Sequence, residues 1–286
     1  MAQDLTMFVP EIWSQKLSRN FDKKSVMLSG GIVNTDHEGE ISQFGDTVHV
    51  QQLGDVTVNE YSGTINTEDL SGATDALEIN KQYYFAFKIG DVEEAQSNTN
   101  LINGYSDRAM SAMKIKVDTL LLAEADSCHA DNIIGTDGTP IELEADNVID
   151  YIMELGLRLD NKEIPDDNRK LVIPPWMRKL IKQSDLADAS KSGDPTSMQR
   201  TGFIGMIDRF EIFISSNIKL TGSPATTYNV LACIPDYLTF ANQLTKVRAI
   251  ELEGSFDTQI SGLQLFGYQV FDQNNIAGAC LKCKLK

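Results

Sequence analysis

The amino-acid sequence predicts a protein of the α+β class, and three features lead to this prediction. Two segments in the first third, 47–53 and 77–89, alternate apolar and polar residues with the period of a β-strand. The segment from about 91 to 128 repeats its apolar residues at helical spacing instead. After residue 247 the chain returns to long alternating runs. Strands separated by so much helical sequence are expected to share a sheet.

Length and composition are those of a globular chain with a substantial core. The 286 residues are 42% hydrophobic and 23% charged, which argues against disorder and against a disulfide scaffold. The net charge of −16 opposes tight nonspecific binding to nucleic acid or to an acidic membrane surface. No run reaches the roughly 18 apolar residues of a transmembrane helix, and the first residues do not read as a signal peptide. We therefore expect a chain that is cytosolic at synthesis.

Residues 1–45 are expected to form an arm with little periodic structure of its own. The two alternating runs follow, separated by a segment at 54–76 that is rich in Gly, Thr, Asp and Asn. Together they predict a long two-stranded hairpin with a polar tip, which cannot bury itself and needs another surface to lie on. The second run places one set of apolar side chains on a single face: Tyr83, Phe85, Phe87 and Ile89.

The charge of this region is one-sided. Between Ser25 and Asn80 there is no Lys or Arg, whereas ten acidic residues occur there. This stretch therefore carries −10 of the net charge of −16, and the rest of the chain carries −6. Two interpretations stay open: a solvated acidic loop, or a projecting acidic arm that docks on a basic surface of a partner.

A long helix and a second unit complete the chain. The helix begins after a capping-box-like Asp91 and runs to about Cys128, with a possible interruption at Asn103-Gly104. The second unit has a helix capped by Asp146 or Asn147. Its elements then include a strand at 169–173, a helix at 176–186, a turn at 205–208, strands near 210–214 and 228–234, and a short helix near 236–241. The first helix of this unit is expected to face a core with six residues: Val148, Ile149, Ile152, Met153, Leu155 and Leu159.

The four cysteines suit a reduced compartment. Cys280 and Cys283 have CxxC spacing, but no second ligand pair accompanies them, as a zinc site would require. They lie in an alternating segment in which Leu281, Cys283 and Leu285 share a face. A strand would point the two cysteines to opposite faces. We interpret them as buried strand residues.

No motif of a catalytic, cofactor or metal site is found. The sequence lacks the nucleophile elbow, the dinucleotide and phosphate-binding glycine loops, and the HExxH zinc motif. His37, His49 and His129 have no partner nearby in the sequence. The acidic segment 131–146 lacks calcium-loop spacing, and turn chemistry at Asp137-Gly138 explains it better. A site assembled only by folding leaves no local trace, so that alternative stays open.

The order of elements resembles the major capsid proteins of tailed bacteriophages, which have the Hong Kong 97-type fold. Segments 8–17 (FVPEIWSQKL) and 39–50 (GEISQFGDTVHV) resemble the opening of the family's arm and the entry into its extended loop. Segment 77–96 (LEINKQYYFAFKIGDVEEAQ) resembles the exit from that loop into the spine helix. The runs at 164–181 and 202–218 resemble parts of the axial domain, and 251–271 resembles the strands that return to the peripheral domain. The resemblance covers nearly the whole chain in the right order.

The resemblance implies a non-catalytic shell protein, without cofactor or metal, that assembles as pentamers and hexamers into an icosahedral virion head. It implies an arm at 1–45, an extended acidic hairpin loop at 46–90, a spine helix and peripheral domain at 91–145, an axial domain at 146–244, and returning strands at 245–286. The shell would enclose double-stranded DNA without binding it specifically, would contact no membrane, and would assemble in the host cytoplasm. We expect subunit contacts between two sets of charges: Lys16, Arg19, Lys23 and Lys24 on one side, and Asp55, Glu60, Glu68 and Asp69 on the other.

Two departures from the family bear on its partners. Some relatives crosslink their shells through a lysine of the extended loop, and no lysine lies between Ser25 and Asn80, so that route is doubtful here. Some relatives begin with a scaffolding segment, whereas this arm starts almost at Met1. We therefore expect a scaffolding protein as a separate chain, together with a portal protein, and leave a decoration protein open.

Two rival functions remain. An encapsulin-like compartment shell would share the fold but package protein cargo. An α/β enzyme with a distributed active site would instead be a small oligomer with a concave site.

Overall fold

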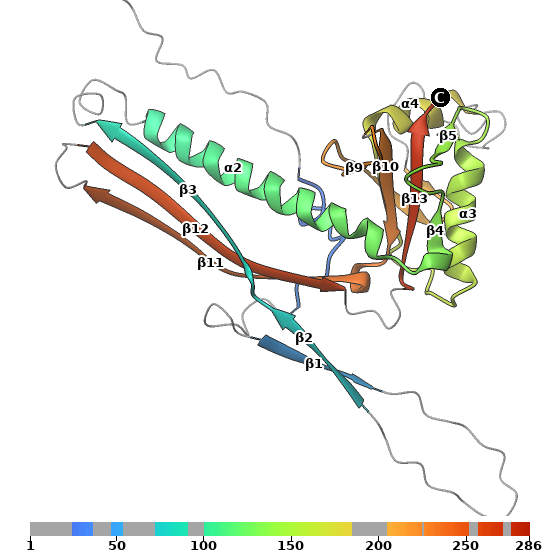
Figure 1. Cartoon of the computed structure of the whole chain (residues 1–286), viewed down its shortest axis with the longest axis horizontal. Helices are drawn as coiled ribbons and strands as arrows, with labels where there is room; N and C mark the ends of the chain where they lie inside the picture. The colour runs from blue at the N-terminus through green and yellow to red at the C-terminus, as the bar shows by residue number, and fades with distance from the viewer. Residues whose placement is uncertain are drawn as a thin grey trace, which may run out of the picture.

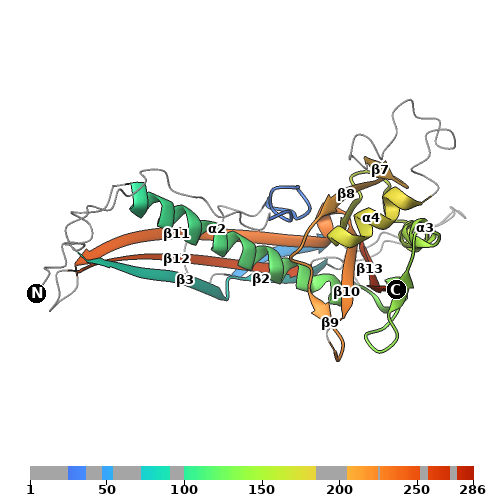
Figure 2. The same cartoon turned by 90° about the horizontal axis from the view of Figure 1, so that it is seen from above.

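The computed structural model describes residues 25–36, 47–53, 72–90, 100–184, 205–224, 226–251, 257–270 and 276–286. The molecule is elongated, with a long helix and a long narrow sheet at one end and a compact sheet-and-helix unit at the other (Figure 1). Figure 2 shows the long helix running along the narrow sheet toward the compact unit. The predicted α+β class is confirmed.

The long helix is α2, Asn100–Ala123, and it continues into the 3-10 turn η2, Glu124–Ser127. It therefore ends where the sequence predicts. The helix is unbroken at Asn103-Gly104, so the possible interruption there is absent. Its buried residues gather toward its C-terminal half, with Val117, Leu121 and Leu122 at most 2% exposed. This half of the helix packs into the core, because it is the half that meets the compact unit (Figure 1).

The narrow sheet, here called the long sheet, has the order β11–β12–β3 and is antiparallel throughout the described residues. Its strands are β11, Leu238–Glu251, β12, Asp257–Val270, and β3, Lys81–Gly90. The prediction of a short helix near 236–241 is wrong, because only one 3-10 turn, η5, Pro235–Tyr237, precedes the start of β11. The strand begins at Leu238 because Leu238 and Phe240 are buried core residues and Thr239 bridges Asn34.

The predicted hairpin exists, but its second strand differs from the prediction. β1, Thr47–Leu53, pairs with β2, Gly72–Glu78, from Thr47 opposite Glu78 to Leu53 opposite Gly72. The alternating run 77–89 is not one strand, because Ile79 and Asn80 interrupt it and β3 pairs with β12 instead. Ile79 is fully buried with Leu77, Ala241 and Leu265, which fixes the place where the chain crosses from the hairpin to the long sheet.

The compact unit contains eight strands among the described residues, here called the eight-stranded sheet. Its main order is β4–β13–β10–β6–β8–β7, with β5 also pairing β13 and β9 also pairing β10. The strands are β4, Ile133–Ile134, β5, Ile141–Leu143, β6, Lys170–Ile173, β7, Met206–Ile207, β8, Phe210–Ile214, β9, Leu220–Thr221, β10, Thr227–Cys233, and β13, Gly278–Leu285. Distant segments do share a sheet, as predicted. The five segment boundaries stay predictions, although pairing puts 278–285 in this sheet and not beside β12.

Helices α3, Val148–Asp160, and α4, Pro175–Gln183, pack on one face of this sheet, and the α2 end and residues 26–33 pack on the other. Cys283 belongs to the core on the α3 side and Cys280 to the core on the α2 side, which confirms the predicted opposite orientation. The structure contradicts the prediction that Met153 is a core residue, since its side chain is 51% exposed. Ile152 and Leu155 already fill the side of α3 that meets the sheet.

Two local details also differ from expectation. Asn147 is the residue before α3, yet its side chain does not cap the helix. Its Oδ1 accepts from the backbone N of Glu144 instead. The tight turn between β7 and β8 lies at Asp208 and Arg209, both with positive φ, rather than at 205–208. Asp208 packs against Gly156 of α3, where a Cβ would lie 2.1 Å from its carboxylate oxygen.

Candidate interaction surfaces

The eight charged residues predicted to form subunit contacts lie outside the described residues, so the structure does not relate them to one another. On one side they are Lys16, Arg19, Lys23 and Lys24, and on the other Asp55, Glu60, Glu68 and Asp69. The sequence does predict that the hairpin needs another surface to lie on, but it does not single out the face of the long sheet described below.

The first surface is the β1–β2 hairpin. It projects away from the long sheet at its crossing point (Figure 1) and, in the described part of the chain, each of its strands pairs only with the other. The crossing is tight, because a Cβ on Gly267 of β12 would lie 2.3 Å from the carbonyl oxygen of Glu78. A two-stranded hairpin has marginal stability in water unless it packs on something else. The hairpin is therefore a candidate for burial against another molecule.

The second surface is the face of the long sheet that α2 does not cover. The α2 side is identified by the tilted ring contact of Phe87 with Tyr105, 6.2 Å between centroids, and by Lys116 Nζ, 5.8 Å from the Tyr83 ring. Neighbouring residues of a strand point to opposite faces. Tyr84 and Lys88 therefore belong to the uncovered face.

Strand register extends this face across the sheet, because directly opposed residues share a face. Tyr84 lies opposite Leu263, and Ala86 lies opposite Ser261, which is itself opposite Arg248. Lys88 lies opposite Gln259, which is opposite Ile250. We call this set the open face: Tyr84, Ala86, Lys88, Arg248, Ile250, Gln259, Ser261 and Leu263.

The open face is apolar and basic. Tyr84 is 78% exposed and Ile250 is 50% exposed, although side chains of this size are commonly buried. Its two charged side chains, Lys88 and Arg248, are both basic and exposed. A sequence signal for it existed: Tyr84 is aromatic on the face of β3 opposite the predicted apolar one. That signal could not show that the face stays uncovered.

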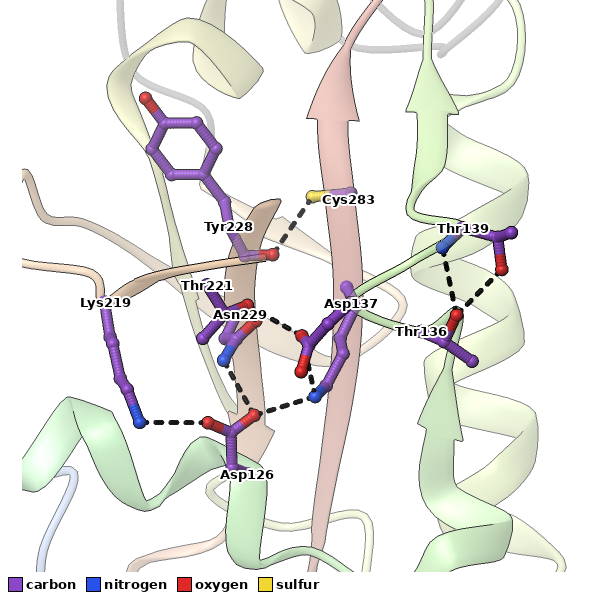
Figure 3. A network of polar contacts seen from close by, with 10 residues as sticks. Asp126, Thr136, Asp137, Thr139, Lys219, Thr221, Tyr228, Asn229 and Cys283 are labelled. Atoms are coloured by element: carbon purple, nitrogen blue, oxygen red, sulfur yellow. Dashed lines mark hydrogen bonds and ion pairs between the residues drawn. The ribbon is translucent and has the colours of Figure 1, made fainter. Parts of the chain in front are cut away.

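A polar network joins the end of α2, here also called the spine helix, to the eight-stranded sheet (Figure 3). Asp126 of η2 accepts from Asn229 Nδ2 at 2.7 Å and pairs with Lys219 at 3.2 Å and Lys282 at 3.0 Å. Lys282 also pairs with Asp137 at 3.0 Å. Hydrogen bonds from Thr221 and Lys282 hold the pKa of Asp137 below its usual value. Burial opposes the charge of Lys282, but its two carboxylate partners raise its pKa. This network is structural, because its charges neutralise each other.

The outer face of β13 continues this pattern. Lys284 pairs with Glu142 directly opposite on β5, 2.9 Å apart, and Lys286 pairs with Glu144. The pKa of Glu142 is lowered by its bond with Lys284, and the pKa of Lys286 is raised by Glu144. Lys284 therefore ties β5 to β13, and Lys286 ties the residue that follows β5 to the residue that follows β13.

In the described part of the chain, His129 and the four cysteines take part in structural contacts. His129 Nδ1 accepts from the backbone N of Asp131 at the start of the 3-10 turn η3, Ala130–Asn132. All four cysteines are buried and free of disulfides, and burial raises the pKa values of Cys233, Cys280 and Cys283. Within the described ranges, no three His, Cys, Asp or Glu side chains could hold a metal ion, and no helix could cross a membrane. A shallow hollow of about 390 Å³ beside Asp137 and Lys284 contains charges that are already paired.

The sequence matches no protein-family model and no curated protein. Solved structures are similar over nearly the whole chain. A chain from Mycobacterium phage Che8 is 22% identical with a TM-score of 0.78, covering 96% of this chain and 97% of that one.

Two capsid structures are similar at lower identity. A chain of the capsid of cyanophage P-SCSP1u is 14% identical with a TM-score of 0.75, covering 98% of this chain and 94% of that one. A chain of the capsid of Ralstonia phage GP4 is also 14% identical, with a TM-score of 0.72 and coverage of 98% and 96%. The projecting hairpin, the long helix α2 and the compact unit thus occur together in a known architecture. The chain has the Hong Kong 97-type fold, which is the fold that the resemblance of its sequence implied.

Proposed function

We propose that this chain is a major capsid protein, whose copies assemble into the icosahedral head shell of a tailed bacteriophage. The observation that carries the proposal is the end-to-end similarity to chains from phage capsids, with 94% or more of each of those chains covered. Because nearly the whole of each capsid chain is covered, the chain offers the complete set of shell-forming elements and not one shared domain. Its role is structural, without catalysis, and its location is the virion after assembly in the host cytoplasm.

The shape supports this role. A monomer would leave the hairpin and the open face in water, including Tyr84 and Ile250. Large apolar side chains that are exposed on one face of a sheet are candidates for cover by a neighbouring subunit. The hairpin and the open face are different surfaces of one chain, so contact between them would be head-to-tail. Head-to-tail contacts generate rings such as pentamers and hexamers when the rotation between subunits closes.

Charge supports the same pairing. The segment 25–80 of one copy, which carries ten acids and no Lys or Arg, would dock on basic residues of its neighbour. The predicted partners are Lys16, Arg19, Lys23 and Lys24 of the arm, and the open face adds Lys88 and Arg248 as a second basic surface. Attraction between such patches would set the register of neighbouring subunits and would weaken in high salt.

The first experiment is negative-stain electron microscopy with light scattering on the purified protein. We expect closed shells, or sheets and rings of five- and sixfold units. If none form, the protein is co-expressed with the scaffolding and portal proteins of its phage, which we propose as separate partners beside a possible decoration protein. A protein that stays a monomer or dimer under co-expression refutes the proposal.

The charge pairing is tested by three variants. Glu60→Gln, Glu68→Gln and Asp69→Asn together remove acidic charge, and Arg248→Glu reverses a basic charge of the open face. Both should slow assembly and reduce its dependence on salt. Lys179→Glu, at an exposed position of α4, is the matched control and should leave assembly unchanged. Unchanged assembly in the first two variants refutes the pairing but not the shell.

The contents and chemistry of the shell separate it from the compartment alternative. A phage head should contain double-stranded DNA and no co-purifying enzyme, whereas a cargo compartment should contain an enzyme. Because the acidic segment has no lysine, boiled shells should run as monomers on a denaturing gel. Empty shells should also bind duplex DNA weakly at physiological salt, since a chain of charge −16 repels phosphate.

A further inference from the structure

Residues 25–36, here called the strap, are built into the centre of the molecule although they form no helix or strand. Val26, Met27, Ile32 and Val33 are at most 5% exposed and belong to the core that contains the spine helix and one face of the eight-stranded sheet. The strap ends beside β11, where Asn34 donates its backbone N–H to Leu238 at 2.9 Å. The strap therefore touches all three large parts of the fold.

One buried carboxylate of the spine helix holds the strap. Asp118 is 0% exposed. Its Oδ1 accepts hydrogen bonds from the backbone N of Val26 at 2.9 Å, the backbone N of Met27 at 2.8 Å and Ser25 Oγ at 3.2 Å. These two backbone N–H groups lie at the start of the turn of residues 27–31, and the Asp118 carboxylate is their acceptor.

The other oxygen of the same carboxylate binds a different part of the fold. Asp118 Oδ2 accepts from Asn217 Nδ2 at 2.8 Å. Asn217 follows β8 in the eight-stranded sheet and is 4% exposed. One side chain thus links the spine helix to the strap through one oxygen and to the eight-stranded unit through the other.

Burying the Asp118 carboxylate costs free energy unless all of its hydrogen-bond donors are in place. A buried carboxylate loses its hydration, and the four donors described here are all neutral groups. An apolar residue at this position of α2 would avoid that cost but would leave two strap N–H groups without an acceptor. The strap also contacts the eight-stranded unit directly, since a Cβ on Gly30 would lie 2.7 Å from Phe213 Cε1 of β8.

We propose that Asp118 is a clasp that couples the root of the N-terminal arm to the seating of the eight-stranded unit on the spine helix. Opening the bond to Asn217 loosens the strap, and loosening the strap frees the eight-stranded unit. If the chain forms a shell, as proposed above, the direction of the arm and the bend of the subunit change together, and shell curvature follows both.

The clasp is tested by moving its charge. Asn217→Asp places a second carboxylate opposite Asp118. Combining it with Asp118→Asn restores an amide donor facing a carboxylate acceptor, with the negative charge now at position 217. Amide hydrogen exchange of residues 26–33 is measured on the soluble protein. We expect exchange at least about tenfold faster in Asn217→Asp, and a return to within about threefold of the parent in the double variant.

Asn229→Asp is the matched control, because Asn229 also donates to a carboxylate, Asp126, from the same unit but has no described hydrogen bond to the strap. It should leave exchange of 26–33 unchanged. Faster exchange confined to 215–219 in Asn217→Asp overturns the clasp. If Asn217→Asp does not fold, the double variant decides: a protected strap supports the clasp and an unprotected strap overturns it. None of these readouts needs assembly, so a failed shell and a failed clasp are distinguishable.

Discussion

The crossing of the hairpin over the long sheet gives the sharpest test of the packing. Replacing Gly267 by Ala puts a Cβ 2.3 Å from the carbonyl oxygen of Glu78, 3.0 Å from its carbonyl carbon and 2.9 Å from Ile79 Cδ1. Removing a glycine from a strand would by itself stabilise the protein by about 0.5–1 kcal/mol. Overpacking costs about 1–3 kcal/mol, and the upper end applies because a backbone carbonyl cannot rotate away. We therefore expect a net loss of about 2 kcal/mol.

The assay is chemical denaturation combined with hydrogen exchange at residues 76–80. Gly262→Ala is the comparison, because its Cβ would lie 2.3 Å from Phe85 Cε1, a half-buried side chain that can turn aside. We expect Gly267→Ala to lower the denaturation midpoint more than Gly262→Ala and to speed exchange at the crossing. A Gly267→Ala protein as stable as the parent would refute the reasoning, since backbone contact would then not be limiting.

Three further predictions concern the compact unit. Lys282→Met should cost about 1–2 kcal/mol at pH 7, because it removes the cation shared by Asp126 and Asp137, whose partial exposure reduces the loss. The pKa of Asp137 is lowered, so its stabilisation exists above its ordinary value of 3.8 and is lost as the pH falls below it; acid titration of Lys282→Met should lose less stability there than the parent does. Burial raises the pKa of Cys283 to about 12 and that of Cys280 well above 9.0, so iodoacetamide at pH 8 should label neither until denaturant is added; rapid native labelling contradicts their burial. Ile152→Ala should cost about 2–4 kcal/mol and Met153→Ala under about 0.5 kcal/mol, measured by denaturation; equal losses would contradict the orientation of α3.

Local patterns in the sequence determine much of this fold. The period-two run in β13 placed Cys280 and Cys283 on opposite faces, and the helical spacing before Cys128 located the end of the spine helix. Both succeed because alternation and helical periodicity reflect which face an element buries.

The failures occur where tertiary partners decide. Nothing within residues 77–89 indicates that β3 pairs with β12, nearly 180 residues later, instead of continuing the hairpin. Met153 has the spacing of a core residue, but the sheet contacts only one side of α3. The open face could not be predicted for the same reason: exposure of Tyr84 follows from what is absent above it in the described structure. The charged residues predicted for subunit contacts lie outside the described ranges, so that prediction stays open.

The position of β13 affects the time at which the molecule can fold. This strand lies between β10 on one side and β4 and β5 on the other, yet it comes from residues 278–285, more than 40 residues after β10 and more than 130 after β5. Until β13 has been synthesised, β10 has an unpaired edge and both cores of the compact unit lack the residues that β13 contributes. Strand pairing over such a sequence distance forms slowly, and the intermediates expose apolar surface that is prone to aggregation. A growing chain should therefore be unable to associate with neighbouring subunits until β13 has been synthesised, so that association follows folding.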